Sequence, residues 1–557
     1  MALIDKASLL MVPSTYEAGK LYNVLPSGNR APDSTGENSG YDQTRADFDF
    51  DRGSNAAATR VNADGLIEKY RENKLLQSNQ FDTSWLNVSS TDTSGQAGYD
   101  GTNNAWKLEK FASAARIYQN ITYSGVNTFS IYVKAGTLNW VMINNGTNSV
   151  FFDIQNGAVG ANIAGGGSVD ASIEAVGAIG WYRVSVVSNV SASVIRIYPA
   201  QADNDFTGTS GSIYIQNAQL ESGLVATDYL ESTSVTGKAG VLIDLPRIDY
   251  SSGAGALLLE PSRANLIQYS EYFEGSYWNT NSNALRSLSS NLSPDGTANA
   301  YRVEAVSGTQ VGYVGVTTIG TTITHSVYVR RISGSTTFDM VDVNNVSTQV
   351  DITNDWKRFS VTASATSTNL RSYLRLNQIG DVVEIFGFQA EIGSYATSYI
   401  PNHGESGGVT RAGDSCSVTG ASDVIGQTEG TMFFELKDTN DFNAYLGVDS
   451  GSTGTRILIY GINDQKVYAQ VRNSSTVIFG STSSVISGGA KCAVAFNSSG
   501  SVFYVNGTQI GSGSGTTFTN LSQVTFNHSS VIGAKIKQTA LFKERLTNEE
   551  LATLTTL

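Results

Sequence analysis

The chain has 557 residues, of which 15% are charged and 56 are glycine, and its formal net charge is −13. The low charge content and the many Gly, Ser, Thr and Asn residues favour short strands and polar turns over helices, so an all-β chain is expected. The length suggests three or four domains at roughly 150 residues each. The negative charge argues against a nucleic-acid partner, because phosphate backbones are bound by clustered Lys and Arg.

The N-terminus predicts neither secretion by a cleaved signal nor membrane insertion. Residues 1–20, "MALIDKASLLMVPSTYEAGK", contain no basic segment followed by an unbroken apolar run, and no window approaches 18 consecutive apolar residues. Any work outside a cell would then require another route, such as release with a virus particle at lysis. The loop "PSGNRAPDSTGENSGYDQTRAD" (26–47) suggests a segment ordered only against a partner. We therefore predict an N-terminal attachment or connector region over residues 1–70.

The segment "DFDFD" places Asp47, Asp49 and Asp51 on one face of a strand. This spacing could offer oxygen ligands to Ca²⁺. The favoured alternative is a solvated acidic face of an edge strand, where charge discourages pairing with other chains.

Two long segments of the chain repeat each other. The segment "KLLQSNQFDTSWLN" at 74–87 matches "NLIQYSEYFEGSYWN" at 265–279, with Phe81 on Phe273 and Trp85 on Tyr277. Four further blocks match in the same order: 100–110 with 295–305, 129–136 with 325–334, 180–187 with 355–362, and 213–230 with 383–400. The blocks alternate apolar and polar residues, as strands with one buried face do. The sequence predicts two homologous β-sandwich modules, at 71–232 and 265–403.

The first copy is longer in one place. Tyr132 and Trp181 are 49 positions apart, whereas the equivalent Tyr328 and Trp356 are 28 apart, so 21 extra residues indicate an added or lengthened hairpin. Apolar and aromatic positions stay in step because both copies need the same core, and polar positions drift because an exposed surface is free to acquire separate contacts.

A second, shorter repeat joins the modules. "TRVNADGLIEKYRENKLL" (59–76) resembles "PRIDYSSGAGALLLEPSRANLI" (246–267), and "VTRAGDSCSVTG" (409–420) repeats its opening. These segments lack the Ser, Gly or Pro monotony of flexible tethers, so we expect docked β connectors, one of them at 233–264.

The last region, 404–557, differs from both copies and predicts a series of hairpins closed by a helix. Asn506-Gly507 favours a type I′ turn, and Thr547 with Glu550 has capping-box spacing. Its two cysteines, Cys416 and Cys492, are more consistent with buried thiols than with a disulfide, although both remain open. The scattered histidines His325, His403 and His528 do not indicate a zinc site.

These motifs carry resemblances to known families. The block from about 430 to 557, with "VNGTQIG" and "ALFKERLTNEELATL", resembles concanavalin-like or laminin-G-like sandwiches. The two repeats resemble jelly-roll carbohydrate-binding modules, and the connectors at 48–68 and 246–273 resemble segments of bacteriophage tail-fibre and virion adhesin proteins. The resemblance implies a phage virion protein, trimeric, with tandem jelly-roll modules and a terminal concanavalin-like sandwich. It also implies a structural Ca²⁺, to which no residues are assigned.

Sugar binding usually depends on exposed aromatic faces beside amide, carboxylate or Arg side chains. Trp106, Tyr301, Trp181 and Trp356 stand in step in matched strands, so core packing explains them. Trp140, with Asn139, Asn144 and Asn145, falls in the longer part of the first copy; it is the best candidate, and packing against a neighbouring subunit is the alternative. Tyr99, Tyr313 and Tyr460 are weaker candidates of the same kind.

No catalytic residues are predicted. The concanavalin-class signature Glu-x-Asp-x-x-Glu is absent, and Glu435 and Asp438 lie on opposite faces of one strand. We expect a non-enzymatic virion protein that joins other virion proteins through its N-terminal region and binds host-surface polysaccharide through weak sites linked by trimerisation. The rival hypotheses are a purely structural virion component and a polysaccharide-degrading tail enzyme.

Overall fold

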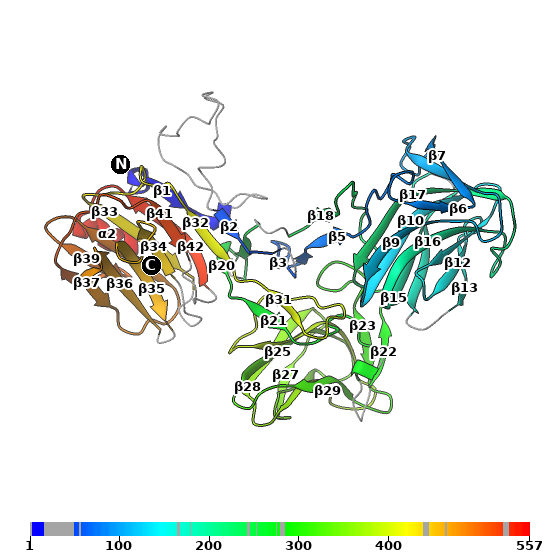
Figure 1. The fold of residues 1–557 in the computed structure, drawn as a ribbon. Helices are drawn as coiled ribbons and strands as arrows, with labels where there is room; N and C mark the ends of the chain where they lie inside the picture. The colour runs from blue at the N-terminus through cyan, green and yellow to red at the C-terminus, as the bar shows by residue number, and fades with distance from the viewer. Residues whose placement is uncertain are drawn as a thin grey trace. The chain divides into compact units, whose positions relative to one another are not determined.

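The structure is a computed structural model that divides into two compact units. Unit 1 comprises Met1–Glu68, Leu242–Arg263 and Arg411–Leu557, and unit 2 comprises Lys69–Val241 and Ala264–Thr410. It describes residues 3–15, 49–54, 57–163, 168–178, 180–241, 245–251, 253–274, 276–278, 284–437, 445–462, 465–526 and 534–556. The predicted all-β class is confirmed, because the described chain is built mainly of antiparallel sheets (Figure 1). No described helix is long and apolar enough to cross a bilayer.

Module 1, the Lys69–Val241 part of unit 2, is a sandwich of two six-stranded sheets. The first sheet has the order β14 (Ser168–Ala175), β15 (Trp181–Asn189), β10 (Val126–Ala135), β17 (Gly211–Ser222), β8 (Ala105–Lys110) and β7 (Ser90–Gln96). The second has the order β13 (Ala158–Ile163), β12 (Ser149–Asp153), β11 (Trp140–Asn144), β16 (Ala192–Ala200), β9 (Arg116–Tyr123) and β6 (Leu86–Val88). Alternate residues such as Leu108, Ile131, Ile117 and Val141 point inward and form one buried apolar core between the sheets.

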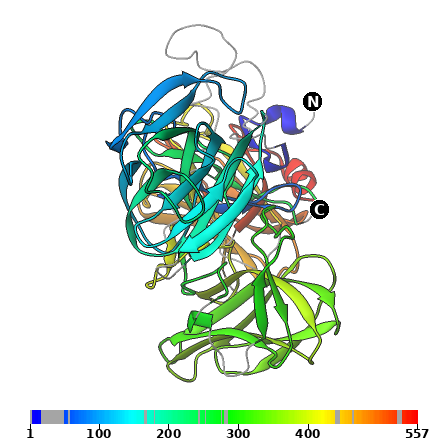
Figure 2. The ribbon, with the colours of Figure 1, turned by 90° about the vertical axis from the view of Figure 1, so that its right-hand side faces the viewer.

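Module 2, the Ala264–Thr410 part of unit 2, repeats this plan with fewer strands (Figure 2). One sheet has the order β22 (Leu285–Leu288), β23 (Tyr301–Glu304), β30 (Val382–Ile392), β25 (Thr322–Ser333) and β28 (Lys357–Ser364). The other has the order β24 (Gln310–Val316), β29 (Asn369–Leu376), β26 (Thr337–Val341) and β27 (Ser347–Asp351). The 3-10 turn η3 (Ser276–Trp278) packs on β24.

The extra residues of module 1 do not form the predicted hairpin, because the two added strands lie in different sheets, and Trp140 does not belong to them. β11 and β12 occupy the places that β26 and β27 occupy in module 2, and the added strands are β13 and β14, which extend one sheet each. The matching "Arg-x-Tyr" pairs at Arg196/Tyr198 and Arg371/Tyr373 set the register between β16 and β29. Trp140 then corresponds to Asp339, because Trp140 pairs two residues beyond Tyr198 and Asp339 pairs two residues beyond Tyr373.

The core alignment holds with one shift. Phe81 and Phe273 are both fully buried, but the ring that packs on Phe273 as Trp85 packs on Phe81 belongs to Trp278, one residue after the predicted Tyr277. The ring centroids are 5.1 Å apart in module 1 and 4.9 Å apart in module 2, with interplanar angles of 51° and 53°. The first segment has three residues between the two rings and the second has four, so the sequence match alone chose the wrong neighbour.

One set of polar residues does not drift. The polar clamp consists of Gln219, Glu221 and Thr227 in module 1, and of Gln389, Glu391 and Thr397 in module 2. The Gln Nε2 donates to the Glu at 2.6 and 2.8 Å, and the Thr hydroxyl donates to the same carboxylate at 2.6 and 2.7 Å. All four Gln and Glu side chains are buried. The expectation that polar positions drift therefore fails where they are buried, since buried polar groups need partners.

Unit 1 is a third sandwich assembled from three separate parts of the chain. Its eight-stranded sheet has the order β19 (Arg247–Asp249), β20 (Ala256–Leu259), β42 (Ala534–Phe542), β33 (Gly430–Leu436), β38 (Ala490–Phe496), β39 (Ser501–Val505) and β40 (Thr508–Gly513), with β1 (Leu9–Met11) also paired to β42. Its seven-stranded sheet has the order β2 (Asp49–Asp51), β32 (Ser415–Val418), β41 (Gln523–Phe526), β34 (Tyr445–Asp449), β35 (Arg456–Ile462), β36 (Lys466–Asn473) and β37 (Thr476–Thr482). One buried cluster lies between these sheets.

The remaining elements are short. They are β3 (Thr59–Val61) paired with β4 (Ile67–Lys69), β5 (Arg71–Asn73) paired with β18 (Gly237–Ala239), β21 (Arg263–Asn265) paired with β31 (Val409–Arg411), the 3-10 turns η1 (Leu3–Lys6) and η2 (Pro13–Thr15), and the helix α2 (Asn548–Thr555). Thr547 and Glu550 form the predicted capping box of α2. Asn506 and Gly507 both have positive φ, 47° and 79°, as the predicted type I′ turn requires.

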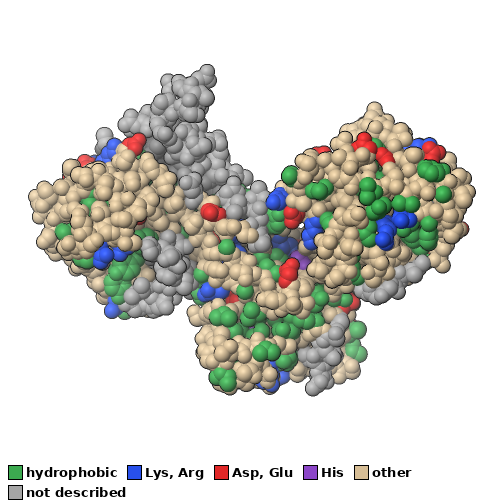
Figure 3. Space-filling model, viewed as in Figure 1, with side chains coloured by type: hydrophobic (Ala, Val, Ile, Leu, Met, Phe, Trp, Pro, Cys, Tyr) green, Lys and Arg blue, Asp and Glu red, His purple; other side chains and the backbone are tan. Residues whose placement is uncertain are grey.

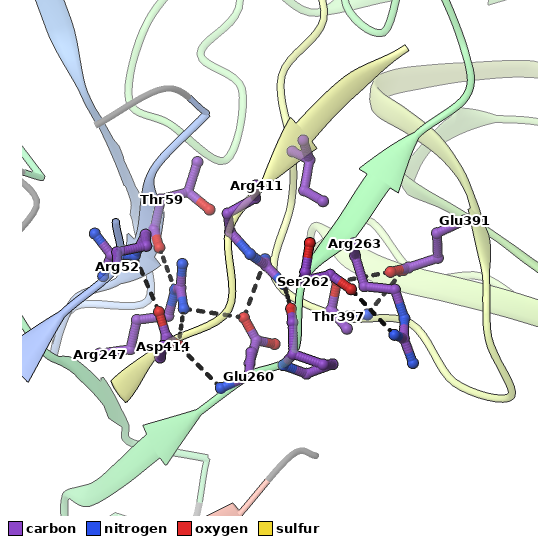
Figure 4. A network of polar contacts seen from close by, with 12 residues as sticks. Arg52, Thr59, Arg247, Glu260, Ser262, Arg263, Glu391, Thr397, Arg411 and Asp414 are labelled. Atoms are coloured by element: carbon purple, nitrogen blue, oxygen red, sulfur yellow. Dashed lines mark hydrogen bonds and ion pairs between the residues drawn. The ribbon is translucent and has the colours of Figure 1, made fainter. Parts of the chain in front are cut away.

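Two of the three arginines of the short connector repeat belong to a buried ionic network in unit 1 (Figure 4). Arg52 Nε donates to Asp414 at 3.1 Å, Arg247 Nη1 also contacts Asp414, and Arg411 Nη1 lies 3.1 Å from Glu260. All five side chains are at most 5% exposed. Arg247 and Arg411 are the repeated arginines of the second and third segments, so they fix these two segments onto the terminal sandwich. The repeated arginine of the first segment, Arg60, instead pairs with Glu68 at 2.6 Å, and Arg52 joins the network from outside the repeat.

This assembly changes the predicted boundaries. The described residues of the region predicted at 1–70 supply β1 and β2 to the sheets of unit 1, and the connector predicted at 233–264 supplies β19 and β20. Pairing of distant segments in one sheet leaves no local sequence signal, which is why the connectors were predicted as separate regions. Cys416 and Cys492 are buried thiols and form no disulfide, as favoured.

Candidate glycan-binding face of module 1

The outer face of the β13-to-β6 sheet carries a row of polar and aromatic side chains, which we call the outer face of module 1. Strand register aligns Asn144 with Arg196, Arg196 with Tyr118, and Tyr118 with Leu86. The period of two puts these residues opposite the core residues Ile143, Ile195, Ile197 and Ile117, so they point away from the sandwich interior. Asn144, Arg196 and Tyr118 are half-buried and Leu86 is exposed.

Two guanidinium groups lie on this face. Arg196 Nη1 donates to Asn144 Oδ1 at 2.7 Å, which fixes both side chains, and the other Arg196 N–H groups make no hydrogen bond to a described residue. The guanidinium carbon of Arg116 lies 5.8 Å from the centroid of the Tyr118 ring and 5.6 Å from that of Tyr198. Arg116 Nε is buried without a hydrogen-bond partner among the described residues. The remaining N–H groups of Arg196 are suited to a carboxylate or sulfate oxygen.

Trp140 lies on the same face but packs mainly against its own module. Trp140 is half-buried beside the cluster of Met142, Phe151 and Tyr198, and the Phe206 ring contacts the rings of Tyr198 and Phe151 at centroid distances of 5.4 and 6.3 Å. A Cβ added at Gly160 would stand 2.5 Å from Trp140 Cζ3, so β13 passes directly against the indole. The predicted alternative of packing against another subunit is not needed to account for the buried part of the ring.

The three predicted asparagines have different environments. Asn139 is exposed just before β11, and Asn144 belongs to the row described above. Asn145 is buried: its Oδ1 accepts from the backbone N–H groups of Thr147 and Asn148 at 3.0 and 2.7 Å, and its Nδ2 donates to Ser188 at 3.0 Å. Asn145 therefore shapes the β11–β12 turn.

Tyr99 lies on the other sheet of module 1, away from this face. Its ring stacks on Tyr132 with centroids 3.9 Å apart and an interplanar angle of 3°, and both belong to a cluster with Trp181. Burial raises the pKa of Tyr132 to about 12, so that hydroxyl stays neutral. The structure does not bring Tyr99 together with Trp140.

The other two predicted tyrosines are also apart from the face. Tyr313 stacks on Tyr277 at 4.5 Å and packs against the core of module 2. Tyr460 lies in unit 1, where it stacks on its cross-strand neighbour Tyr468 at 5.1 Å. The predicted aromatic candidates thus fall in separate places rather than in one site.

The acidic candidates form no metal site among the residues that the structure describes. Asp47 and Asp438 lie outside the described residues, while Asp49 and Asp51 belong to β2, an edge strand of unit 1. Asp51 is exposed and accepts from the backbone N–H of Gly53 at 2.6 Å. Within the described ranges, no three His, Cys, Asp or Glu side chains are placed to hold a metal ion. Glu435 is buried and accepts from Gln538 at 2.6 Å.

The sequence reasoning missed Arg116, Tyr118, Arg196 and Tyr198. Their signal is the period of two in "RIYQ" (116–119) and "VIRIYPA" (194–200), where isoleucines supply the core and Arg and Tyr take the opposite face. Figure 3 shows Lys and Arg side chains beside apolar side chains on the surface of the strands that Figure 1 labels β6 to β17. A search for outward-facing Arg and Tyr on neighbouring strands would have found them.

Comparisons with known proteins give the following similarities. No family model matches the chain, and no curated protein matches it. Among solved structures, the CBM40 of the Ruminococcus gnavus IT-sialidase bound to α2,3-sialyllactose is 18% identical over 24% of this chain and 86% of that chain, with a TM-score of 0.22. The tandem CBM22-1–CBM22-2 domain of Paenibacillus barcinonensis Xyn10C is 13% identical over 61% and 100%, with a TM-score of 0.21. Domains LG4-5 of the mouse laminin α1 chain are 10% identical over 50% and 89%, with a TM-score of 0.13. The sandwich architecture assigned to this chain rests on its own strand pairing.

Proposed function

We propose that the chain is a non-catalytic glycan-binding protein and that module 1 binds an acidic glycan on its outer face. The observation that carries the proposal is the row Asn144, Arg196 and Tyr118, which places an amide, a guanidinium and an aromatic ring side by side on three neighbouring strands. An aromatic ring can stack on the C–H surface of a pyranose, the amide can bond its hydroxyls, and the guanidinium can bond a carboxylate.

The charge on the face favours an acidic sugar over a neutral one. Arg196 keeps N–H groups that bond to no described residue, and the chain as a whole is negative, so the guanidinium groups of Arg116 and Arg196 form a local exception.

The carboxylates near the outer face of module 1 support the non-catalytic part of the proposal. Two carboxylates lie near Trp140, and backbone N–H groups hold both of them. Asp153 accepts from Gln155 and Asn156 at 3.0 Å each, and Asp203 accepts from Ala161 at 2.7 Å. Glycosidic hydrolysis generally uses two carboxyl groups flanking the bond. A protein that acts here as a binder should retain the polysaccharide without releasing reducing ends.

We further propose that the protein is a bacteriophage virion component that attaches to host-surface polysaccharide as a homotrimer. The sequence resemblance of the connectors to tail-fibre and adhesin segments supports this proposal. Weak faces on three linked copies would gain avidity, because linking raises effective concentration. Light scattering of the purified protein tests the trimer: a monomer at micromolar concentration would contradict it.

The decisive experiment measures retention of the full-length protein on acidic and neutral polysaccharides. Arg196→Ala and Tyr118→Ala should each weaken binding to the retained acidic polysaccharide about tenfold, as expected for one charged hydrogen bond or one stacking contact. Trp140→Ala should weaken it less, because part of that ring packs inside the module.

Arg371→Ala is the matched control. Arg371 occupies the same strand position in module 2, where Val314 pairs with it in place of Tyr118. Retention that falls equally in Arg371→Ala and Arg196→Ala, or the absence of retention on every acidic polysaccharide, would contradict the proposed face.

A further inference from the structure

One edge of the sandwich, formed by the first and last residues of each module, is built the same way in both modules. In module 1, Ser78 Oγ contacts the Tyr229 hydroxyl at 2.6 Å and accepts from the backbone N–H of Ser232 at 2.9 Å. In module 2, Ser270 makes the same contacts with Tyr399 at 2.6 Å and Asn402 at 2.8 Å. We call this the terminal edge of each module. Because the framework is shared, differences between the two edges reflect what covers them.

The terminal edge of module 2 is covered. The carbonyl of His403 accepts from the backbone N–H of Val126 of module 1 at 2.6 Å, and the Tyr269 hydroxyl contacts Asn189 at 3.3 Å. Val126, Val187 and Leu224 of module 1 belong to the same buried apolar cluster as Ile267 and the core of module 2. Aromatic and apolar residues are thus buried between the two modules, as is typical of the centre of a protein–protein contact.

A lysine fills the remaining part of that edge. Lys69 Nζ lies 3.0 Å from Glu271 and 2.5 Å from Asp295, both of which are 1% exposed, and 5.4 Å from the centroid of the Phe386 ring. The Tyr399 hydroxyl and Asn299 Nδ2 also donate to Glu271, at 2.9 and 3.2 Å. Lys69, Tyr399 and Asn299 therefore supply the partners of the buried Glu271 carboxylate.

The same edge of module 1 is open. It contains a cavity of about 480 Å³ whose lining includes Gln77, Asn79, Gln80, Asn103, Asn104 and Glu231. Gln77 and Gln80 correspond to Tyr269 and Tyr272 of module 2, and Asn79 corresponds to Glu271. Where one module has tyrosines that pack on a neighbour, the other has amides around a space of the size that small ligands occupy.

Several polar groups of this cavity have no protein partner. The side-chain amides of Gln77, Gln80 and Asn103 make no hydrogen bond to a described residue, whereas Asn79 is held by Asn104 at 3.1 Å and by the backbone N–H of Asn217 at 3.0 Å. Ser232, which is 4% exposed, also lines the cavity, and its buried hydroxyl lacks a partner among the described residues. Its counterpart Asn402 is fully engaged with Gly404 and Glu405.

We propose that the terminal edge of module 1 is a second binding site and that it takes a neutral pyranose residue of a glycan. Each amide can offer a donor and an acceptor to neighbouring hydroxyls of the sugar, and the buried Ser232 hydroxyl would gain a partner. The described lining contains no Lys or Arg, and its one carboxylate is Glu231, so an acidic sugar is not favoured. This site goes beyond the proposed outer face, which bears two guanidinium groups and lies on the flat surface of a sheet.

The test measures the binding of neutral oligosaccharides to the full-length protein by calorimetry and saturation-transfer NMR. The oligosaccharides are those of glucose, mannose, galactose and N-acetylglucosamine. The double variant Gln77→Ala/Gln80→Ala should weaken binding of the neutral oligosaccharide at least about tenfold, and Arg196→Ala should leave it unchanged. Gln349→Ala is the matched control, because Gln349 is an exposed glutamine on β27 of module 2.

Three results would overturn the proposal. They are the absence of binding to every neutral oligosaccharide, binding that the double variant leaves intact, and a fall in oligomer size in the double variant, which would make the edge a docking surface for a second copy. Loss of acidic-polysaccharide binding in Arg196→Ala concerns the outer face alone, so the two proposals fail separately.

Discussion

Module 1 and module 2 share a core and a polar clamp, yet they differ at several positions where a side chain meets solvent or a neighbour. On the outer face, the positions of Trp140, Arg116 and Tyr118 in module 1 are taken by Asp339, Gly312 and Val314 in module 2, although Tyr198 and Tyr373 still correspond. The Tyr373 ring lies over Gly312, so close that a Cβ there would stand less than 2 Å from a ring atom. In module 2, therefore, the Tyr373 ring occupies the space in which module 1 has the Arg116 side chain.

The difference teaches that duplication has separated two tasks. Module 2 uses its terminal edge to hold module 1 and the connector lysine, and module 1 keeps its own terminal edge and outer face open. Buried polar groups that close each sandwich cannot change without loss of partners, so they are repeated in both copies. The following variants test how much each of these differences contributes to the stability of its module.

The largest expected effect is that of Lys69→Ala. Although burial opposes the charged form of Lys69, Asp295 and Glu271 outweigh it and raise the lysine pKa. The variant leaves two buried carboxylates without their cation, which typically costs about 3–5 kcal/mol. Hydrogen exchange followed by mass spectrometry should show faster exchange in the peptides around Glu271 and Asp295, with module 1 peptides far from the edge unchanged.

Lys238→Ala is the control, since Lys238 is an exposed lysine on β18 of the same unit. Its loss should change the free energy of unfolding by less than about 1 kcal/mol, as surface charges do. Equal effects of the two variants would mean that Lys69 does not hold the terminal edge of module 2.

A smaller effect, dependent on pH, is expected at a core position. Phe129 in β10 and His325 in β25 are equivalent, and both are at most 3% exposed. Burial outweighs the Val341 backbone and Asp342, and lowers the pKa of His325 to about 4. Since the unfolded histidine titrates near 6.5, His325 binds its proton more readily in the unfolded state. Module 2 should therefore lose stability as the pH falls from 6.5 towards 4, by up to about 3 kcal/mol.

His325→Phe should remove most of this acid sensitivity, and Phe129→His should create it in module 1. The measurement is the free energy of local opening from hydrogen exchange of the β10 and β25 peptides at pH 7 and at pH 4.5. A β25 free energy that stays constant across this range in the wild-type protein would show that His325 is not the acid-sensitive group.

These cases also show how far sequence reasoning reached. Period-two patterns and the matched blocks predicted the sandwiches, because Phe81, Phe273 and the alternating strand residues form the core that both copies need. Trp140 was chosen as a candidate because it lies among polar residues in the longer part of the first copy. Its position in β11 was not predicted, since the number of inserted residues does not say which strand is new. The period of two marks Arg196 and Tyr118 as outward-facing, but their side-by-side placement and the terminal edge depend on pairing between strands far apart in the chain. Single-strand patterns do not contain that information.

The smallest effect tests the similarity rather than the differences. Thr227→Val and Thr397→Val each remove one hydroxyl that donates to a buried Glu of the polar clamp, at 2.6 and 2.7 Å, with almost no change in volume. The backbone N–H of each Thr also donates to that Glu, at 2.9 and 2.8 Å, so the carboxylate keeps part of its partners. Each variant should cost about 1–2 kcal/mol, and the two costs should agree within about 0.5 kcal/mol. Hydrogen exchange of the β17 and β30 peptides measures both in the full-length chain. A cost in one module alone would mean that the repeated geometry hides different energetics, and that the clamp is kept in the other copy for a reason besides closing the sandwich.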